Sequence, residues 1–82
     1  MALYTITYDL RNNRDYKTLY EELEAFNAVK ILESTWCFKR DKTTSPNLRD
    51  YFGKLTDSDD GIFICEVKAW ASRKTDGTPK AL

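Results

Sequence analysis

Apolar and polar residues alternate in "LYTITYDL", residues 3–10. One side of an extended chain would carry Tyr4, Ile6, Tyr8 and Leu10, and the other would carry Leu3, Thr5, Thr7 and Asp9. This period of two predicts a strand over 3–10 with one buried face. The run ends on a carboxylate, and strand ends are common places for binding or reactive groups because the sheet fixes the residue while the loop leaves room for a ligand. Asp9 is therefore a candidate functional residue.

Two later segments repeat their apolar residues at helical spacing. The first has Asp15 in the position of an N-cap and ends near Asn27, and its apolar side carries Tyr16, Leu19, Tyr20, Leu23 and Phe26. The second has Ser45 as N-cap and Pro46 at the first helical position, followed by Leu48, Tyr51, Phe52 and Leu55. These patterns predict helices over 15–27 and 46–55.

The remaining apolar segments are rich in β-branched and aromatic residues. Residues 28–41 are too many for one ordinary strand, so we expect two short strands with a break near 33–35. Alternation in "IFICEVKAW" predicts a last strand over 62–70. Residues 73–82 contain Gly77 and Pro79 and show no periodicity. They predict a C-terminal extension or flexible tail after a domain spanning 1–72.

The order strand, helix, strand, strand, helix, strand predicts the fold class. It is typical of an α+β, ferredoxin-like βαββαβ fold, in which a four-stranded antiparallel sheet carries two helices on one face. The other face of the sheet would have no cover. Because a chain of 82 residues buries only a modest core, we expect this half-apolar face to form a homodimer.

Composition restricts the chemistry. The 13 basic and 13 acidic residues give no net charge, so binding of a phosphate would have to be local. The chain has no histidine, which excludes Ser-His-Asp and Cys-His nucleophiles and leaves oxygen ligands for a metal. Mg²⁺ or Mn²⁺ is the cofactor that such ligands favour. Cys37 and Cys65 are expected to be reduced core residues.

No apolar stretch is long enough to span a membrane, and the first residues lack the basic region and apolar core of a signal peptide. We therefore expect a cytoplasmic protein without a membrane partner. Nucleic acid remains a candidate partner through local charge. Five basic residues could converge near the strand ends as a phosphate-binding strip, namely Arg11, Arg14, Lys39, Arg40 and Lys42.

The candidate residues also have structural interpretations. Trp36 and Phe38 could stack on bases, but aromatic residues on one side of a strand more often belong to a core or a dimer interface. Basic side chains are most often solvated surface charge. Asp9 could form an Asx turn by accepting hydrogen bonds from the amides of Arg11 or Asn12. The segment "DSDDG" is more typical of a solvated turn than of a metal loop.

Four segments together resemble a known family. "YTITYDL", "ESTWCF", "SPNLRDYFGKL" and "DSDDGIFICEV" resemble, in order and spacing, the small SinR-like proteins related to the Cas-two family of CRISPR systems. The pair Tyr8-Asp9 is the most specific part of this resemblance, which covers about residues 3–70. It implies a ferredoxin-like homodimer in which Asp9 meets its symmetry mate and binds a divalent metal.

Two functions follow from these expectations. One is a weak metal-dependent endonuclease, an endoribonuclease, in which paired Asp9 carboxylates hold the metal, with Asp59 or Asp60 as added ligands if the acidic turn folds back. The other is a non-catalytic homodimeric module that binds nucleic acid or a protein partner. Relatives of both kinds occur in the family that the chain resembles, so the resemblance alone does not choose between them.

Overall fold

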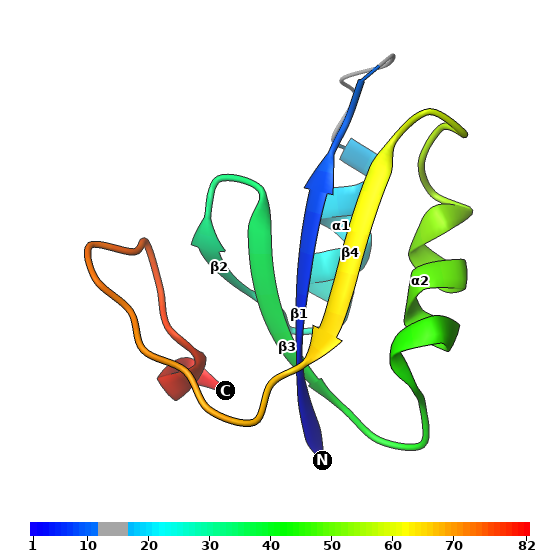
Figure 1. Ribbon diagram of the computed structural model, residues 1–82. Coiled ribbons are helices and arrows are strands. Elements are labelled where there is room, and N and C mark those ends of the chain that lie inside the picture. The colour runs from blue at the N-terminus through cyan, green and yellow to red at the C-terminus, as the bar shows by residue number, and fades with distance from the viewer. Residues whose placement is uncertain (12–16) are drawn as a thin grey trace.

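The computed structural model describes residues 1–11 and 17–82. Its helices and strands alternate along the chain in the order β, α, β, β, α, β, and a short 3₁₀ turn follows near the C-terminus (Figure 1). Their bounds are β1 Ala2–Asp9, α1 Lys17–Ala25, β2 Val29–Leu32, β3 Thr35–Arg40, α2 Ser45–Gly53, β4 Gly61–Glu66 and η1 Pro79–Ala81. The predicted class, α+β, is confirmed.

The four described strands form one antiparallel sheet in the order β2-β3-β1-β4. In the centre, β1 pairs with β3 on one side and with β4 on the other, so that Ile6 lies opposite both Trp36 and Ile64. This arrangement is compatible with a ferredoxin-like fold. It also places the end of β1 beside the start of β4, since Asp9 pairs with Gly61.

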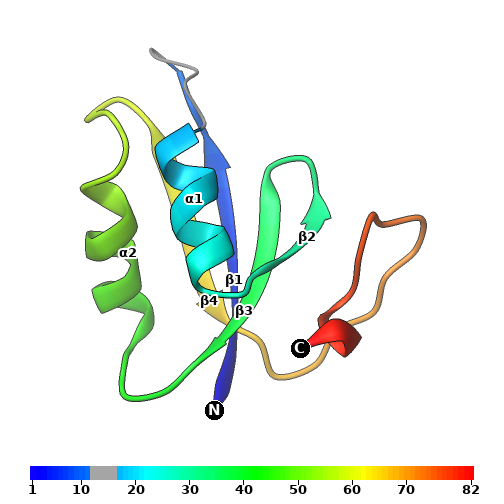
Figure 2. The ribbon, with the colours of Figure 1, turned by 180° about the vertical axis from the view of Figure 1, so that it is seen from behind.

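Both helices pack against the same face of the sheet (Figure 2). Phe38 of β3 and Phe52 of α2 are fully buried, and their rings lie 5.9 Å apart. The core also contains the alternating residues predicted for the first strand, together with residues of both helices: Tyr4, Ile6, Tyr8, Leu10, Leu19, Leu23, Phe26, Trp36 and Leu48. Trp36 and Phe38 are therefore core residues.

The helices occur where helical spacing predicts them, with different ends. Helix α1 ends at Ala25, and Asn27 then adopts a left-handed conformation with φ of 57° that no helix can continue. The predicted cap Asp15 lies outside the described residues. Thr44, and not Ser45, caps α2, because its side chain accepts a hydrogen bond from the N–H of Asn47. No helix in the described part of the chain is long and apolar enough to cross a membrane.

The observed strands confirm the predicted break within 28–41, but the last strand is shorter than predicted. The break in 28–41 lies at residues 33–34, between β2 and β3, as expected. The last strand ends at Glu66 and not at residue 70, although the N–H of Val67 still donates to Leu3 across 2.8 Å. Beyond that bond the chain leaves the sheet, although β1 continues to Ala2, which still pairs with Arg40 of β3. Alternation alone cannot reveal where a strand leaves its partner.

The C-terminal segment, residues 67–82, crosses below the sheet and runs beside β2 (Figure 1). The N–H of Asp76 donates to Ile31 across 2.8 Å, and the amine of Lys39 donates to the main-chain oxygen of Leu82 across 3.3 Å. Gly77 lies so close to Val29 and Lys30 that an added Cβ would be 2.6 Å from the carbonyl oxygen of Lys30. The segment therefore covers the β2 side of the sheet.

Candidate functional site

The end of β1 carries the first group of candidate residues. The guanidinium of Arg11 contacts the carboxylate of Asp9 at 3.2 Å and donates to the main-chain oxygen of Asp59 at 3.2 Å. Both side chains of the ion pair remain more than half exposed. Asp9 thus ends the strand, as predicted, with its charge balanced by a cation two residues later along the chain.

Asp60 organises the turn that faces Asp9. One carboxylate oxygen accepts from the N–H of Arg11 at 2.7 Å, and the other accepts from the N–H of Asp57 at 2.8 Å. The amide of Arg11, one of the two that could form an Asx turn with Asp9, therefore donates to Asp60, and the other, that of Asn12, lies outside the described residues. The segment "DSDDG" forms a turn, closed by the N–H of Asp60 donating to Asp57 at 3.0 Å. Asp60 thus joins the ends of β1 and β4.

A shallow pocket of about 310 Å³ opens beside Asp9. Its lining combines an acid, a base and an exposed aromatic side chain: Thr7, Tyr8, Asp9, Arg11, Gly61, Ile62 and Phe63. Phe63 is 65% exposed. The pocket could receive a small group that contacts a carboxylate and a guanidinium together.

The donor groups for a metal are few. Among residues 1–11 and 17–82, no cluster of three or more histidine, cysteine or acidic side chains is placed to hold a metal ion. Asp60 already binds two main-chain amides, and Asp9 faces the Arg11 guanidinium. Within one chain these groups do not make a site for Mg²⁺ or Mn²⁺, which requires several oxygen ligands at once.

The second group of candidates lies at the opposite end of the sheet. Lys39 and Arg40 end β3, where Arg40 pairs with Ala2 at the start of β1, and Lys42 follows in the next loop. They are separated from Arg11 by the length of β1, roughly 23 Å at about 3.3 Å per residue. The predicted Arg14 lies outside the described residues. The structure thus brings Arg40 and Lys42 together in one pocket, whereas Lys39 lies on the other face of β3, where it donates to Leu82, and Arg11 lies at the far end of the sheet.

Arg40 and Lys42 line a pocket of about 370 Å³ between β3 and α2. The Arg40 guanidinium lies 3.9 Å from the centre of the Phe26 ring, a cation–π contact that holds the charge in place. The other lining residues are Asp41, Thr43, Asn47, Leu48 and Tyr51. The pocket therefore combines two cations with an aromatic wall and one acid, Asp41, which pairs with the N-terminal amine at 3.4 Å.

Tyr51 supplies the accessible part of that wall. Its ring is 43% exposed and lies 5.7 Å from Phe26, and its hydroxyl donates a hydrogen bond to Glu22. This hydrogen bond, assisted by burial and by the Glu22 charge, raises the pKa of Tyr51, while the Arg40 charge opposes the shift. The hydroxyl therefore stays protonated at neutral pH.

The accessible aromatic residue is not one of the two that the sequence suggested as stacking surfaces. Trp36 and Phe38 are buried under the helices, whereas Tyr51 is exposed beside Arg40. Tyr51 precedes Phe52 in the helical repeat, and both belong to the predicted apolar side of α2. The sequence did contain an indication of this exposure, because the apolar side of α2 is wider than the stripe that a helix buries against one sheet face. One of two adjacent aromatic residues must then remain exposed.

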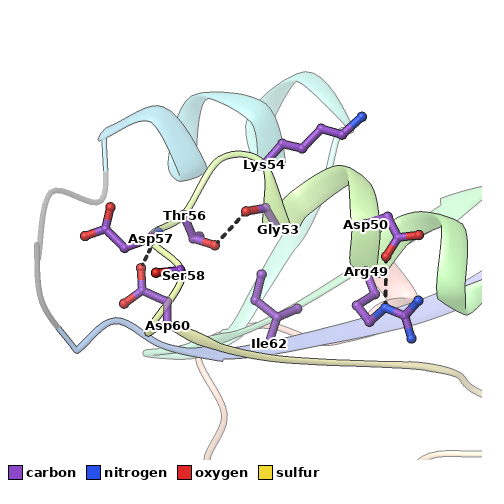
Figure 3. A pocket seen from close by; sticks show the side chains of 9 residues that line it. All are labelled: Arg49, Asp50, Gly53, Lys54, Thr56, Asp57, Ser58, Asp60 and Ile62. Atoms are coloured by element: carbon purple, nitrogen blue, oxygen red, sulfur yellow. Dashed lines mark hydrogen bonds and ion pairs between the residues drawn. The ribbon is translucent and has the colours of Figure 1, made fainter.

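A third pocket, of about 420 Å³, follows the outer side of α2 and the acidic turn (Figure 3). Arg49 and Lys54 of the helix side lie across from Asp57 and Asp60 of the turn, and Ile62 forms the apolar wall between them. A neighbouring pocket of about 270 Å³ shares Arg49 and Ile62 and continues along β4. Together the two pockets line the space between α2 and β4.

No protein-family model matches the chain, and no solved structure gives a significant match.

Proposed function

We propose that this protein is a homodimeric, nucleic-acid-associated protein of ferredoxin-like fold, related to the SinR-like proteins of the Cas-two family, and that it acts as a non-catalytic binding module. The observation that carries the proposal is the pocket at the end of β3. There Arg40 and Lys42 flank the exposed ring of Tyr51. Cations beside an exposed aromatic ring are the combination by which proteins bind single-stranded nucleic acid, with phosphates on the cations and a base on the ring.

The ferredoxin-like assignment is supported by the order of elements and by the central position of β1 and β3 in the sheet. The proposed dimer is supported by the part of the sheet that the C-terminal segment does not cover. That segment follows β2, whereas Phe63 on β4 is 65% exposed. A large exposed aromatic side chain on a sheet of a small domain favours association with a second copy.

The test is binding of fluorescently labelled single-stranded RNA and DNA, followed by anisotropy at several salt concentrations. The variant Arg40→Ala with Lys42→Ala should bind more weakly, and its logarithmic salt dependence should fall by about 1 for each phosphate that the variant no longer neutralises. Lys17→Ala with Lys54→Ala removes the same charge elsewhere and should bind like the wild type. Equal weakening in both double variants, or no binding by the wild type, would exclude the pocket as the binding site.

A second candidate function is the metal-dependent endonuclease. It is favoured by one observation, that Asp9 and Arg11 line the same exposed pocket. In a phosphodiesterase a carboxylate would hold the ion and a guanidinium would bind the phosphate. Because one chain supplies too few ligands, this function needs two Asp9 side chains at a dimer axis. Cleavage of a single-stranded RNA that requires manganese and disappears in Asp9→Asn would support it, and equal cleavage by wild type and variant would exclude it.

A further inference from the structure

Strand β4 is an edge strand. In the sheet of described residues its one neighbour is β1, whereas the opposite edge, β2, is joined to the C-terminal segment through Asp76 and Ile31. Edge strands in monomeric proteins are commonly protected by lysine, proline or a bulge. The sequence of β4, Gly61–Glu66 or "GIFICE", has none of these, and its pairing with β1 is regular. The one charge on the strand is Glu66 at its end, so the main-chain groups of residues 61–65 are open to pairing with another strand.

The pattern of hydrogen bonds shows which main-chain groups point outward. The N–H of Val67 donates to Leu3, so Leu3 and Val67 form a hydrogen-bonded pair of the antiparallel ladder. Such pairs alternate, which makes Cys65, Phe63 and Gly61 the other residues bonded to β1. The N–H and C=O groups of Ile62, Ile64 and Glu66 consequently face away from the sheet.

Helix α2 forms one wall of a groove along this edge. The pocket of about 270 Å³ is lined by Ser45, Pro46 and Arg49 of α2 and by Ile62, Phe63 and Ile64 of β4. Ile62 and Ile64 point to the helix face of the sheet and Phe63 to the other face, because neighbouring side chains of a strand alternate. A pocket lined by all three must therefore lie at the edge itself.

We propose that β4 pairs with β4 of a second copy of this chain, antiparallel about a two-fold axis at Ile64, and so joins two sheets into one. This deepens the proposed function, on whose dimer it rests, by naming the interface. In this register Ile64 pairs with the partner's Ile64, and Ile62 pairs with the partner's Glu66. Two outward-facing strands satisfy each other's main-chain groups in the manner of β-strand addition.

Charge selects this register. Glu66 of one copy lies opposite Ile62 of the other, on the helix side where Arg49, which also pairs with Asp50 at 3.0 Å, lines the groove. Moving the axis to Phe63 would place Glu66 opposite Asp60, and like charges directly opposite each other destabilise a sheet. Moving it to Cys65 would leave only Ile64 to Glu66 paired. The register at Ile64 therefore pairs residues 62–66 of both copies and places Glu66 beside Arg49 of the other copy rather than opposite an acid.

The same register separates the two Asp9 side chains. Asp9 pairs with Gly61, which lies at the start of β4 on either side of the axis. The two Asp9 residues would then lie roughly 20 Å apart along the strand direction, at about 3.3 Å per residue. They could not share a metal ion, so this interface supports the binding module and opposes the paired-aspartate nuclease.

A cross-link tests the register. In the proposed dimer Phe63 lies directly opposite the partner's Cys65 in a non-hydrogen-bonded pair, whose side chains are close enough for a disulfide. Oxidising Phe63→Cys with oxidised glutathione should give a covalent dimer, and Phe63→Cys with Cys65→Ser should not. Cross-linking that survives Cys65→Ser would place the axis at residue 63, and cross-linking of the wild type would place it at Cys65; either result would overturn the proposal.

Charge reversal provides an independent measurement. Arg49→Glu and Glu66→Arg should each weaken the dimer by roughly twofold to thirtyfold, because the exposed pair occurs twice and each copy contributes modestly. The combined variant should recover the affinity, which sedimentation equilibrium would measure. A monomeric wild type at all concentrations would remove the dimer of the proposed function as well, while a dimer that neither cross-links nor responds to the reversals would overturn the β4 interface alone. Nucleic-acid binding is measured separately in both cases.

Discussion

The carboxylate of Asp60 accepts a hydrogen bond from the main-chain N–H of Arg11 across 2.7 Å, although the two residues are far apart in the sequence. The contact holds the chain as it leaves β1 against the turn that begins β4. It also explains why Arg11 can reach both Asp9 and the main-chain oxygen of Asp59. An acid that the sequence offered as a metal ligand thus has a structural role.

Removing the Asp60 carboxylate should weaken this end of the sheet. Asp60→Ala leaves two amides without their acceptor and is expected to lower the free energy of unfolding by about 0.5–2 kcal/mol, as the removal of a helix cap does. Asp57→Asn removes the same charge from the same turn but keeps the main-chain bond, so it serves as the control. Urea unfolding of the three proteins would measure the difference, and equal stability of all three would contradict the role of Asp60.

Neutralising Asp9 should have little effect on stability. Its pair with Arg11 is solvent-exposed, so Asp9→Asn is expected to change the free energy of unfolding by less than about 1 kcal/mol. The change should be the same in chelator and in manganese, as measured by thermal unfolding. Asp41→Asn, an exposed acid at the opposite end of β1, is the control. A variant that melts above wild type in chelator and no longer gains stability from manganese would instead indicate paired carboxylates.

Substitution of Gly77 by alanine tests the contact of the C-terminal segment with β2, and the same substitution at Gly53, the last residue of α2, is the control. Gly77→Ala would place a Cβ 2.6 Å from the carbonyl oxygen of Lys30, so the segment should move away from β2. Amide exchange at Asp76 should then become faster, because its hydrogen bond to Ile31 is broken. Gly53→Ala meets no atom within 4 Å and should stabilise the protein by about 0.4–1 kcal/mol. Unchanged protection of Asp76 in Gly77→Ala would show that the segment tolerates the added group.

Titration of Tyr51 should depend on Glu22. Glu22→Gln removes the charge that favours the protonated phenol, so the pKa of Tyr51 should move down toward 10.0. Since the folded-state pKa of wild-type Tyr51 is raised, its contribution to stability is complete below the pKa of the unfolded chain and is lost as pH rises through the folded-state value. Tyrosinate absorbance of Glu22→Gln and wild type, with Tyr51→Phe to identify the signal, would measure the shift. An upward or absent shift would contradict Glu22 as the cause of the raised pKa.

The sequence by itself determined the elements. Side chains that alternate along 3–10 give β1, because a pleated strand turns every second residue to the same face, and the break at 33–34 gives the β2–β3 hairpin. Burial of Trp36 and Phe38 follows from the same alternation. The ends were less predictable. A strand can leave the sheet before its partner ends, as β4 does after Glu66 while β1 continues to Ala2. A helix cap depends on which of two adjacent hydroxyls meets the first free amide, here Thr44.

Only the tertiary structure decided which polar residues meet. Arg11 and Lys39 are both basic residues near strand ends, but β1 and β3 are antiparallel, so their charges lie at opposite ends of the sheet. The register of β1 with β4 brings Asp60 to Arg11, and packing of α2 on the sheet buries Phe52 while leaving Tyr51 exposed beside Arg40. Local pattern reflects how each residue meets its neighbours in the chain, whereas these contacts depend on the pairing of segments that are distant in sequence, and it is that pairing that builds both candidate sites.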